Sequence, residues 1–216
     1  MMDVGLDPRV WPGVLILIGL ILVSRFLRSR IFSILLVVLL LCHVAFFRDF
    51  APKVPVGNSV ISPASGKVTQ IDSVREDRFL KEEVWRIHIF LAVWNVHVTR
   101  SPMDGTVVYQ EHELGKHINA LLPEASLYNE SNWIGIQQNR RQALIRQMTG
   151  AIARRIFSDV SKGDVVGRGE KLGIICYGSG VELFIPKSMF NPTIRVGQRV
   201  KVGETVLGEW TEAVKS

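Results

Sequence analysis

Two long apolar runs lie within the first fifty residues of the chain. Residues 10–24 and 31–47 carry almost no charge, and Arg25, Arg28 and Arg30 lie in the bend between them. Runs of this kind predict two helices joined by a short turn. Neither run reaches the roughly 20 apolar residues of a perpendicular membrane span. The pair could therefore cross a membrane twice or dip into one leaflet.

After residue 50 the pattern changes to short β-type runs separated by Gly, Pro and Asn. This spacing is typical of a compact, mainly β sandwich or barrel-like domain. We therefore expect a hydrophobic membrane anchor, a helical hairpin, over residues 1–50 and a β domain over residues 51–216. The runs expected to form strands are residues 67–71, 84–93, 105–109, 131–137, 170–177, 181–185 and 205–210.

One segment of the second part has helical spacing. Apolar residues from Ile145 to Ile156 recur at intervals of three and four, which predicts a helix over residues 142–157. Gly150 interrupts this pattern, so a partly extended conformation stays open.

A seven-residue pattern occurs twice. Residues 62–68 read S-P-A-S-G-K-V and residues 101–107 read S-P-M-D-G-T-V, so both follow S-P-x-x-G-x-V. Pro and Gly shape a turn that leads into a strand. The repetition predicts pseudo-symmetric turn-strand units within the β fold.

Charge adds a preference for one kind of partner. The chain has 26 Lys and Arg against 20 Asp and Glu, a net charge of +6. Basic residues beside an apolar anchor favour an anionic lipid surface. No aromatic-interleaved basic stripe points to nucleic acid. Neither Cys42 nor Cys176 lies in a metal-binding spacing, so we expect no metal.

The chemical signal is Gly178-Ser179-Gly180 between two apolar runs. By itself, this tripeptide is typical of a hairpin turn. Other segments change that interpretation: F-R-D at 47–49, the turn at 62–68, W-N-V-H-V-T-R-S-P at 94–102, G-A-I-A-R-R-I at 150–156 and Y-G-S at 177–179. Together they resemble the short, membrane-associated bacterial and archaeal type of phosphatidylserine decarboxylase.

The resemblance implies a proenzyme that cuts itself before Ser179. Its products would be a β chain, residues 1–178, and an α chain, residues 179–216, whose first residue becomes a covalent pyruvoyl group. The mature enzyme would convert phosphatidylserine to phosphatidylethanolamine and CO2 through a Schiff base to that group.

The chemistry has an independent logic. Decarboxylation of an amino acid leaves a carbanion, and a Schiff base to a ketone supplies the electron sink that side chains lack. Making the ketone requires the Ser179 hydroxyl to attack the Gly178 carbonyl. Glycine at position 178 eases that close approach.

His97 matches the histidine of the family motif and would be the base. A histidine between two valines is otherwise typical of a packed strand. The family's usual first turn reads S-P-A-D-G-K-V, and its aspartate orients the histidine; this chain has Ser65 at that position. Losing the carboxylate removes the group that fixes the imidazole tautomer. Asp72 and Asp104 are candidates to replace it.

Arg100, Arg154 and Arg155 also match family segments. A guanidinium fork suits a phosphodiester or a carboxylate, so we expect these residues to bind substrate. The alternative interpretation is a solvated or lipid-facing basic surface.

The bend arginines and the resemblance together predict a location. The positive-inside rule holds the bend in the cytoplasm, and the resemblance implies an enzyme on the cytoplasmic face of the cell membrane. Both hold if the hairpin enters only the cytoplasmic leaflet. A second function stays open because of Ser65: an uncleaved, non-catalytic, membrane-tethered β module that binds lipid or protein. The oligomeric state, a homo-oligomer included, is also open.

Overall fold

The computed structural model describes residues 4–115, 128–150, 155–176 and 179–211 of the chain. The chain folds into two compact units, Met1–Ala51 and Pro52–Ser216. The first unit holds the two apolar runs, and the second holds the runs of β type.

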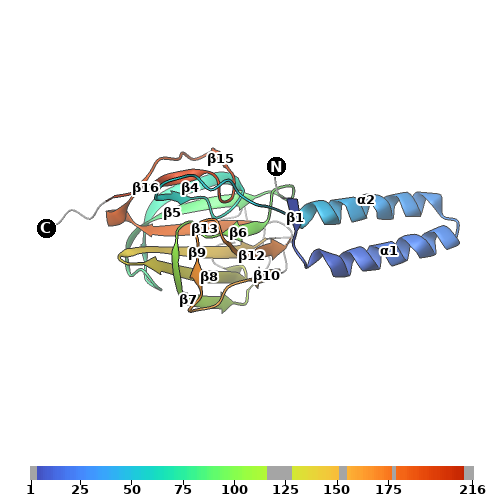
Figure 1. Ribbon diagram of the computed structural model, residues 1–216, viewed down its shortest axis with the longest axis horizontal. Helices are drawn as coiled ribbons and strands as arrows, with labels where there is room; N and C mark the ends of the chain where they lie inside the picture. Colours follow the sequence, from blue (N-terminus) through green and yellow to red (C-terminus); the bar gives the residue numbers. More distant parts are fainter. Residues whose placement is uncertain (1–3, 116–127, 151–154, 177–178, 212–216) are drawn as a thin grey trace. The chain divides into compact units, whose positions relative to one another are not determined.

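The first unit consists of two helices and a short β ribbon. The helices lie side by side (Figure 1), and the hydroxyls of Ser24 and Ser33 form a buried hydrogen bond of 2.7 Å between them. The Ser24 hydroxyl also lies 2.9 Å from the Ile21 carbonyl oxygen, and the Ser33 hydroxyl lies 3.0 Å from that of Ser29, so both buried hydroxyls have partners within the helical pair. The elements are β1 (Val4–Leu6), α1 (Val10–Phe26), α2 (Arg30–Phe46) and β2 (Arg48–Phe50), and β1 pairs with β2 antiparallel.

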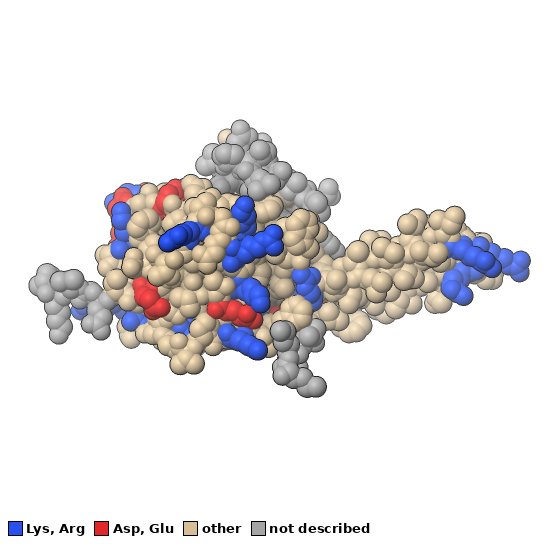
Figure 2. All heavy atoms as spheres, turned by 90° about the horizontal axis from the view of Figure 1, so that it is seen from above, with Lys and Arg blue, Asp and Glu red and all other residues tan. Residues whose placement is uncertain are grey.

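The bend between the helices is basic. Arg28 has a φ of 55°, a left-handed conformation that ends the helical path between α1 and α2. Arg25, Arg28 and Arg30 line a shallow pocket there, and Figure 2 shows basic side chains at this tip and largely uncharged surface along the helices. Within the described part of the chain, no helix combines the length and hydropathy needed to cross a membrane.

The second unit is built around a curled, antiparallel eight-stranded sheet (Figure 1). Its strand order is β11-β7-β8-β9-β13-β5-β4-β15. The bounds are β4 (Gly66–Glu76), β5 (Glu82–Leu91), β7 (Gly105–Glu113), β8 (Ser131–Gln138), β9 (Arg141–Thr149), β11 (Val165–Val166), β13 (Ser179–Pro186) and β15 (Arg199–Val200).

Two three-stranded sheets complete this unit, in the orders β10-β12-β6 and β14-β16-β3. Their strands are β3 (Ser59–Ile61), β6 (Val98–Arg100), β10 (Arg155–Ser158), β12 (Lys171–Cys176), β14 (Phe190–Pro192) and β16 (Val206–Trp210), and a short 3-10 helix, η1, covers Lys187–Met189.

The main hydrophobic core lies on one face of the curled sheet. Alternate residues from Ile87 to Leu91 on β5 and from Val181 to Ile185 on β13 are apolar and fully buried, as the two-residue period of a strand requires. Ile87 and Ile89 on β5 meet Leu183 and Val181 on β13 in direct register. We call this the inner face. The outer face carries a smaller cluster: Leu80, Val84, Trp133, Leu144 and Phe184.

The mainly β class is confirmed, and strands occupy all seven runs expected to form them. The helix predicted for residues 142–157 is wrong. Its first part is β9, and Arg155–Ser158 form β10; residues 151–154 lie outside the described residues. From Ala143 to Thr149 every residue of β9 is buried. Burial on both faces removes the polar alternation by which a strand is recognised.

The two S-P-x-x-G-x-V segments form matching turns. In each, the serine hydroxyl donates to the carbonyl two residues later, Ser62 to Ala64 (2.7 Å) and Ser101 to Met103 (2.5 Å). Each turn leads into a long strand, β4 or β7. A Cβ on Gly66 would lie 2.1 Å from the Phe90 carbonyl oxygen, so only glycine permits this close approach.

Candidate active site

Ser179 is the first residue of β13, a central strand of the sheet. Its main chain pairs with Leu91 of β5 on one side and Thr149 of β9 on the other. Strand β12 ends at Cys176, immediately before the Tyr177–Gly178 connection. Gly178, the expected site of the cleavage carbonyl, lies outside the described residues. Ser179 therefore lies at the point where the polypeptide leaves β12 of the three-stranded sheet and enters β13 of the curled sheet.

His97 is fully buried immediately before β6. Its carbonyl accepts a 3.2 Å hydrogen bond from the N–H of Ile175, which lies four residues before Ser179. Its Nδ1 lies 2.9 Å from the Asn95 carbonyl oxygen. A carbonyl only accepts, so a hydrogen bond here requires Nδ1 to carry the proton. In the neutral ring, Nε2 is then the basic nitrogen.

Buried polar side chains on β6, β8 and β9 form a hydrogen-bonded series, and β9 pairs with the strand of Ser179. The Gln147 amide donates to the Thr99 hydroxyl (2.5 Å), and Asn132 donates to the Gln147 carbonyl oxygen (2.7 Å). Thr99 in turn donates to the carbonyl of Gly173 (3.2 Å). Gln147 is two residues from Thr149, the partner of Ser179. These hydrogen bonds were not predicted from the sequence, although polar residues inside otherwise apolar strands are a signal for them.

Ser65 supports a neighbouring loop. Its hydroxyl accepts a 2.9 Å hydrogen bond from the main-chain N–H of Val202, and Ser65 itself is buried. Asp104, the equivalent residue of the second turn, does the same with the N–H of Arg168 at 2.8 Å. In both turns, the side chain at the fourth position therefore accepts a hydrogen bond from a main-chain N–H of a distant loop.

Neither candidate for the missing carboxylate has geometry that suits the role. The carboxylate of Asp104 accepts a hydrogen bond from the main-chain N–H of Arg168. Asp72 forms a two-point contact with Arg86, at 2.9 and 2.6 Å, and this partner lowers the pKa of the carboxyl group. Among the contacts of the described residues, the Asn95 carbonyl is the acceptor found at Nδ1 of His97.

Of the three arginines expected to bind substrate, the two that the structure describes, Arg100 and Arg155, lie apart. Arg155 is exposed and pairs with Cys176, at the end of β12 that leads to Ser179. Arg100 pairs with Lys171 at the other end of β12, roughly 16 Å away at about 3.3 Å per residue. Its guanidinium is buried and donates to the carbonyl of Gly169 at 2.9 Å. This geometry supports the fold around Gly169. Arg154 lies outside the described residues.

His88 lies close to Gly180, although its sequence context gave no sign of a role. A Cβ on Gly180, the residue after Ser179, would lie 2.7 Å from His88 Nε2. Nδ1 of His88 forms a 2.9 Å hydrogen bond with the Thr69 hydroxyl, and buried Nε2 has no hydrogen-bond partner among the described residues. Burial lowers the pKa of His88, and the charges of Arg86 and Arg146 lower it further against the opposing effect of Glu182.

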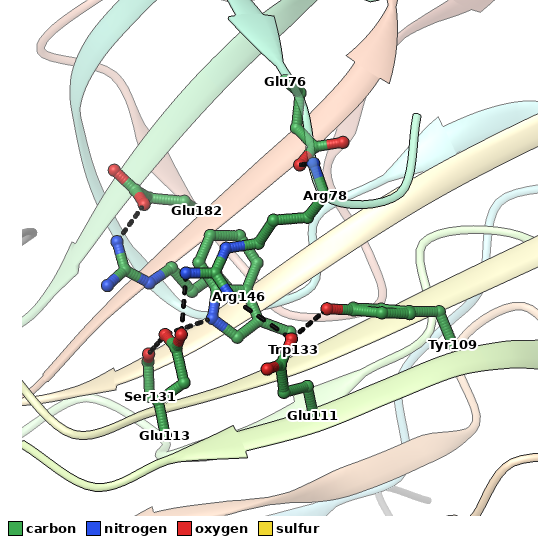
Figure 3. A network of polar contacts seen from close by, with 9 residues as sticks. All are labelled: Glu76, Arg78, Tyr109, Glu111, Glu113, Ser131, Trp133, Arg146 and Glu182. Atoms are coloured by element: carbon green, nitrogen blue, oxygen red, sulfur yellow. Dashed lines mark hydrogen bonds and ion pairs between the residues drawn. The ribbon is translucent and has the colours of Figure 1, made fainter. Parts of the chain in front are cut away.

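The outer face of the sheet carries a connected polar network (Figure 3). Two guanidinium groups, those of Arg78 and Arg146, lie 4.7 and 4.6 Å from the ring centre of Trp133. Glu182 pairs with Arg146 at 3.3 Å, and Glu113 pairs with Arg78 at 2.7 Å. Each guanidinium therefore has an acidic partner on the face opposite the core, and buried Nε of Arg146 has no hydrogen-bond partner among the described residues.

Known proteins resemble this chain over most of its length. The model of a family described as phosphatidylserine decarboxylase matches residues 39–208. A phosphatidylserine decarboxylase proenzyme of Carboxydothermus hydrogenoformans is 39% identical over 195 residues, 90% of this chain and 92% of that protein. One of Nitrosomonas eutropha is 34% identical over 203 residues, 93% of each chain. One of Syntrophotalea carbinolica is 40% identical over 151 residues, 69% of this chain and 70% of that protein.

These matches cover most of a mainly β protein. Its buried His97 lies near β12, the strand that precedes Ser179. The chain belongs to the phosphatidylserine decarboxylase family. The family resemblance predicted from the sequence is confirmed.

Proposed function

We propose that this chain is a phosphatidylserine decarboxylase proenzyme. It cuts itself between Gly178 and Ser179 and then converts phosphatidylserine to phosphatidylethanolamine and CO2. The observation that carries the proposal is the geometry of His97: a buried imidazole, held at Nδ1 by the Asn95 carbonyl, next to the strand that leads to Ser179.

In the self-cleavage, the Ser179 hydroxyl attacks the Gly178 carbonyl and His97 Nε2 accepts the hydroxyl proton. The peptide bond breaks as the ester forms, and the proton goes to the freed amine. Loss of the Cα proton of Ser179 then expels the Gly178 carboxylate and leaves dehydroalanine. Its enamine tautomerises to an imine, and water hydrolyses the imine to the ketone with release of ammonia. No external oxidant or reductant enters this balance.

The surroundings of Ser179 fit a pyruvoyl group. Its main chain is fixed on both sides by β5 and β9, which would hold the new terminus in place. The buried Gln147 amide on β9, the strand that pairs with β13, and the buried Thr99 hydroxyl on β6 are fixed by their own hydrogen bonds. The pyruvoyl group supplies the electron sink for decarboxylation. His97 would hold or return the proton at the substrate carbon.

For the first unit we propose a monotopic anchor in the cytoplasmic leaflet of the cell membrane. Large apolar side chains are exposed on both helices, and the bend carries three arginines that suit anionic head groups. The exposed side chains include Leu15, Ile16, Leu22, Ile31, Ile34 and Leu41.

One observation favours a second candidate, an uncleaved and non-catalytic module that binds lipid or protein at the membrane. Ser65 is engaged with Val202, and no carboxylate replaces the family's aspartate at position 65. A carbonyl at Nδ1 gives the protonated form of a histidine less support than a carboxylate does.

Intact mass of the full chain under denaturing conditions separates the two candidates. The decarboxylase gives two fragments, residues 1–178 and 179–216, with pyruvoyl on the smaller one, and phosphatidylserine vesicles yield phosphatidylethanolamine. Ser179→Ala should give one chain. Ser188→Ala, at an exposed serine, is the matched control and should be cut as the original is. Normal cutting of Ser179→Ala would refute the proposal.

A further inference from the structure

A pocket of about 170 Å³ opens beside the residues that surround His97 and Ser179. Its lining includes Gly66, Lys67, Ala92, Trp94, Asn95 and Arg199. Known sites for drug-sized ligands have volumes of roughly 300 Å³ or more. This pocket therefore suits a small polar group, not the acyl chains of a lipid.

Three lining residues connect the pocket to the proposed chemistry. Asn95 supplies the carbonyl at Nδ1 of His97. Ala92 follows Leu91, whose main chain pairs with Ser179. Gly66 follows Ser65 in the first S-P-x-x-G-x-V turn. The pocket lining is therefore connected to His97 through Asn95 and to Ser179 through the neighbour of Ala92, Leu91.

Two cations lie together at this pocket. Arg199 of β15 is the register partner of Lys67 of β4, and both side chains are exposed. Neither forms an ion pair with another described residue, and no Asp or Glu is among the lining residues. Elsewhere on the sheet, Arg78, Arg86 and Arg146 are all matched by acids. Lys67 and Arg199 therefore leave a local positive charge available to an anion.

The rim of the pocket is apolar and aromatic. Trp94 in the lining is 76% exposed, and its chain neighbour Val93 is 45% exposed. An exposed tryptophan beside basic residues is suited to the head-group level of a bilayer, because its ring is apolar and its N–H is polar. This combination favours a lipid over a soluble anion.

We propose that this pocket binds the phosphodiester of a phospholipid head group. Lys67 and Arg199 hold the phosphate oxygens, and Trp94 lies among the head groups while the acyl chains stay in the bilayer. The proposal rests on the proposed function for the identity of the substrate, phosphatidylserine. The rest of the head group then extends toward the Asn95–His97 side of the pocket.

The binding test uses dihexanoyl-phosphatidylglycerol, a short-chain phosphodiester without the amine that reacts with a ketone. Calorimetry on the full chain, below the micelle concentration of the probe, gives its Kd. Lys67→Gln combined with Arg199→Gln should weaken binding about 10-fold or more, as expected for charge-assisted hydrogen bonds. The control, Arg140→Gln combined with Lys162→Gln, removes the same charge at exposed sites outside the pocket and should stay within about 2-fold.

Inorganic phosphate is the second probe and should bind far more weakly, because it has no glycerol or acyl portion to contact Trp94. Equal affinity for both probes would refute a lipid site, and so would equal weakening by the control pair.

A kinetic arm separates this inference from the proposed function. With phosphatidylserine micelles as substrate, the Lys67→Gln, Arg199→Gln double variant should have a KM about 10-fold higher, with little change in kcat and no change in self-cleavage. If the protein is active but neither Kd nor KM changes in the Lys67→Gln, Arg199→Gln double variant, the pocket is refuted and the decarboxylase is not. A protein that binds the probe through Lys67 and Arg199 but makes no phosphatidylethanolamine would refute the decarboxylase alone.

Discussion

Nδ1 of His97 lies 2.9 Å from the main-chain carbonyl oxygen of Asn95. A carbonyl can hold the imidazole in the tautomer whose Nε2 is basic, but it lacks the full negative charge that stabilises an imidazolium. The Asn95 carbonyl thus orients the proposed base, His97, but does not supply the negative charge that the family's usual aspartate would add.

Restoring the carboxylate should therefore accelerate self-cleavage. In Ser65→Asp the carboxylate can still accept the Val202 N–H and adds negative charge in the turn beside the Ala92–Asn95 pocket. We expect cutting at least about 10-fold faster, a modest share of what an aspartate contributes in triad chemistry. Fragment appearance over time on denaturing gels measures it.

Ser65→Ala is the companion variant. It leaves the buried Val202 N–H without its acceptor, which should lower the free energy of unfolding by about 1–3 kcal/mol with little change in the cutting rate of folded protein. Equal cutting rates in Ser65→Asp and the original chain would show that charge at position 65 has no influence on His97.

His88 should make the protein sensitive to acid. Burial lowers the pKa of His88 from its ordinary value of 6.5, so below about pH 6.5 the unfolded chain binds a proton that the folded chain does not. Stability contributed by this site is therefore lost as pH falls from 6.5 toward the lowered pKa. His88→Asn, which can keep a bond to Thr69, should flatten the fall of Tm over this range.

The matched control is His112→Asn at a partly exposed histidine of β7, 42% exposed in its side chain. It should retain the acid-dependent fall in Tm that His88→Asn reduces. Parallel pH curves for His88→Asn and the original chain would contradict the prediction, whatever constant offset separates them.

Removing one member of the Arg146–Glu182 pair should lower the free energy of unfolding more than replacing both members does. The two side chains are 9% and 3% exposed, so Glu182→Gln leaves a buried guanidinium with less compensation. We expect Glu182→Gln to lower the free energy of unfolding of the β unit by about 3–5 kcal/mol. Urea unfolding followed by tryptophan fluorescence measures the loss.

A second variant tests the origin of that loss. Arg146→Met combined with Glu182→Gln removes both charges and keeps an apolar stem against Trp133, so it should recover part of the stability. A double variant less stable than Glu182→Gln would show that the stacking of Arg146 on Trp133 (4.6 Å) matters more than the unpaired charge.

The proposed anchor predicts that the helical bend and the β unit face the same side of the membrane. Cysteine at Arg28 in the bend and at exposed Lys162 in the β unit should both react with an impermeant maleimide on one side of sealed vesicles, in a background with Cys42 and Cys176 replaced by serine. Labelling of the two sites from opposite sides would establish a spanning arrangement.

Local sequence patterns identified the elements whose chemistry is local. The apolar runs gave two helices, alternation and turn residues gave the seven expected strands, and the repeated S-P-x-x-G-x-V gave matching turns. The helix expected over residues 142–157 was wrong because β9 lies inside the sheet, between β8 and β13, and its residues from Ala143 to Thr149 are buried on both faces. A strand in that setting shows no polar face, and its residual spacing imitates a helix.

The sequence by itself determined the family, the Gly178-Ser179 pair and the absence of aspartate at position 65, because each is a matter of residue identity and order. Only the tertiary structure decided what those residues contact. Ser65 meets Val202 across 137 positions of the chain, Thr99 meets Gln147 across 48, and Lys67 lies beside Arg199 through the pairing of β4 and β15. Such contacts follow from strand register and sheet curvature, which depend on packing of the whole domain and leave no trace at short range.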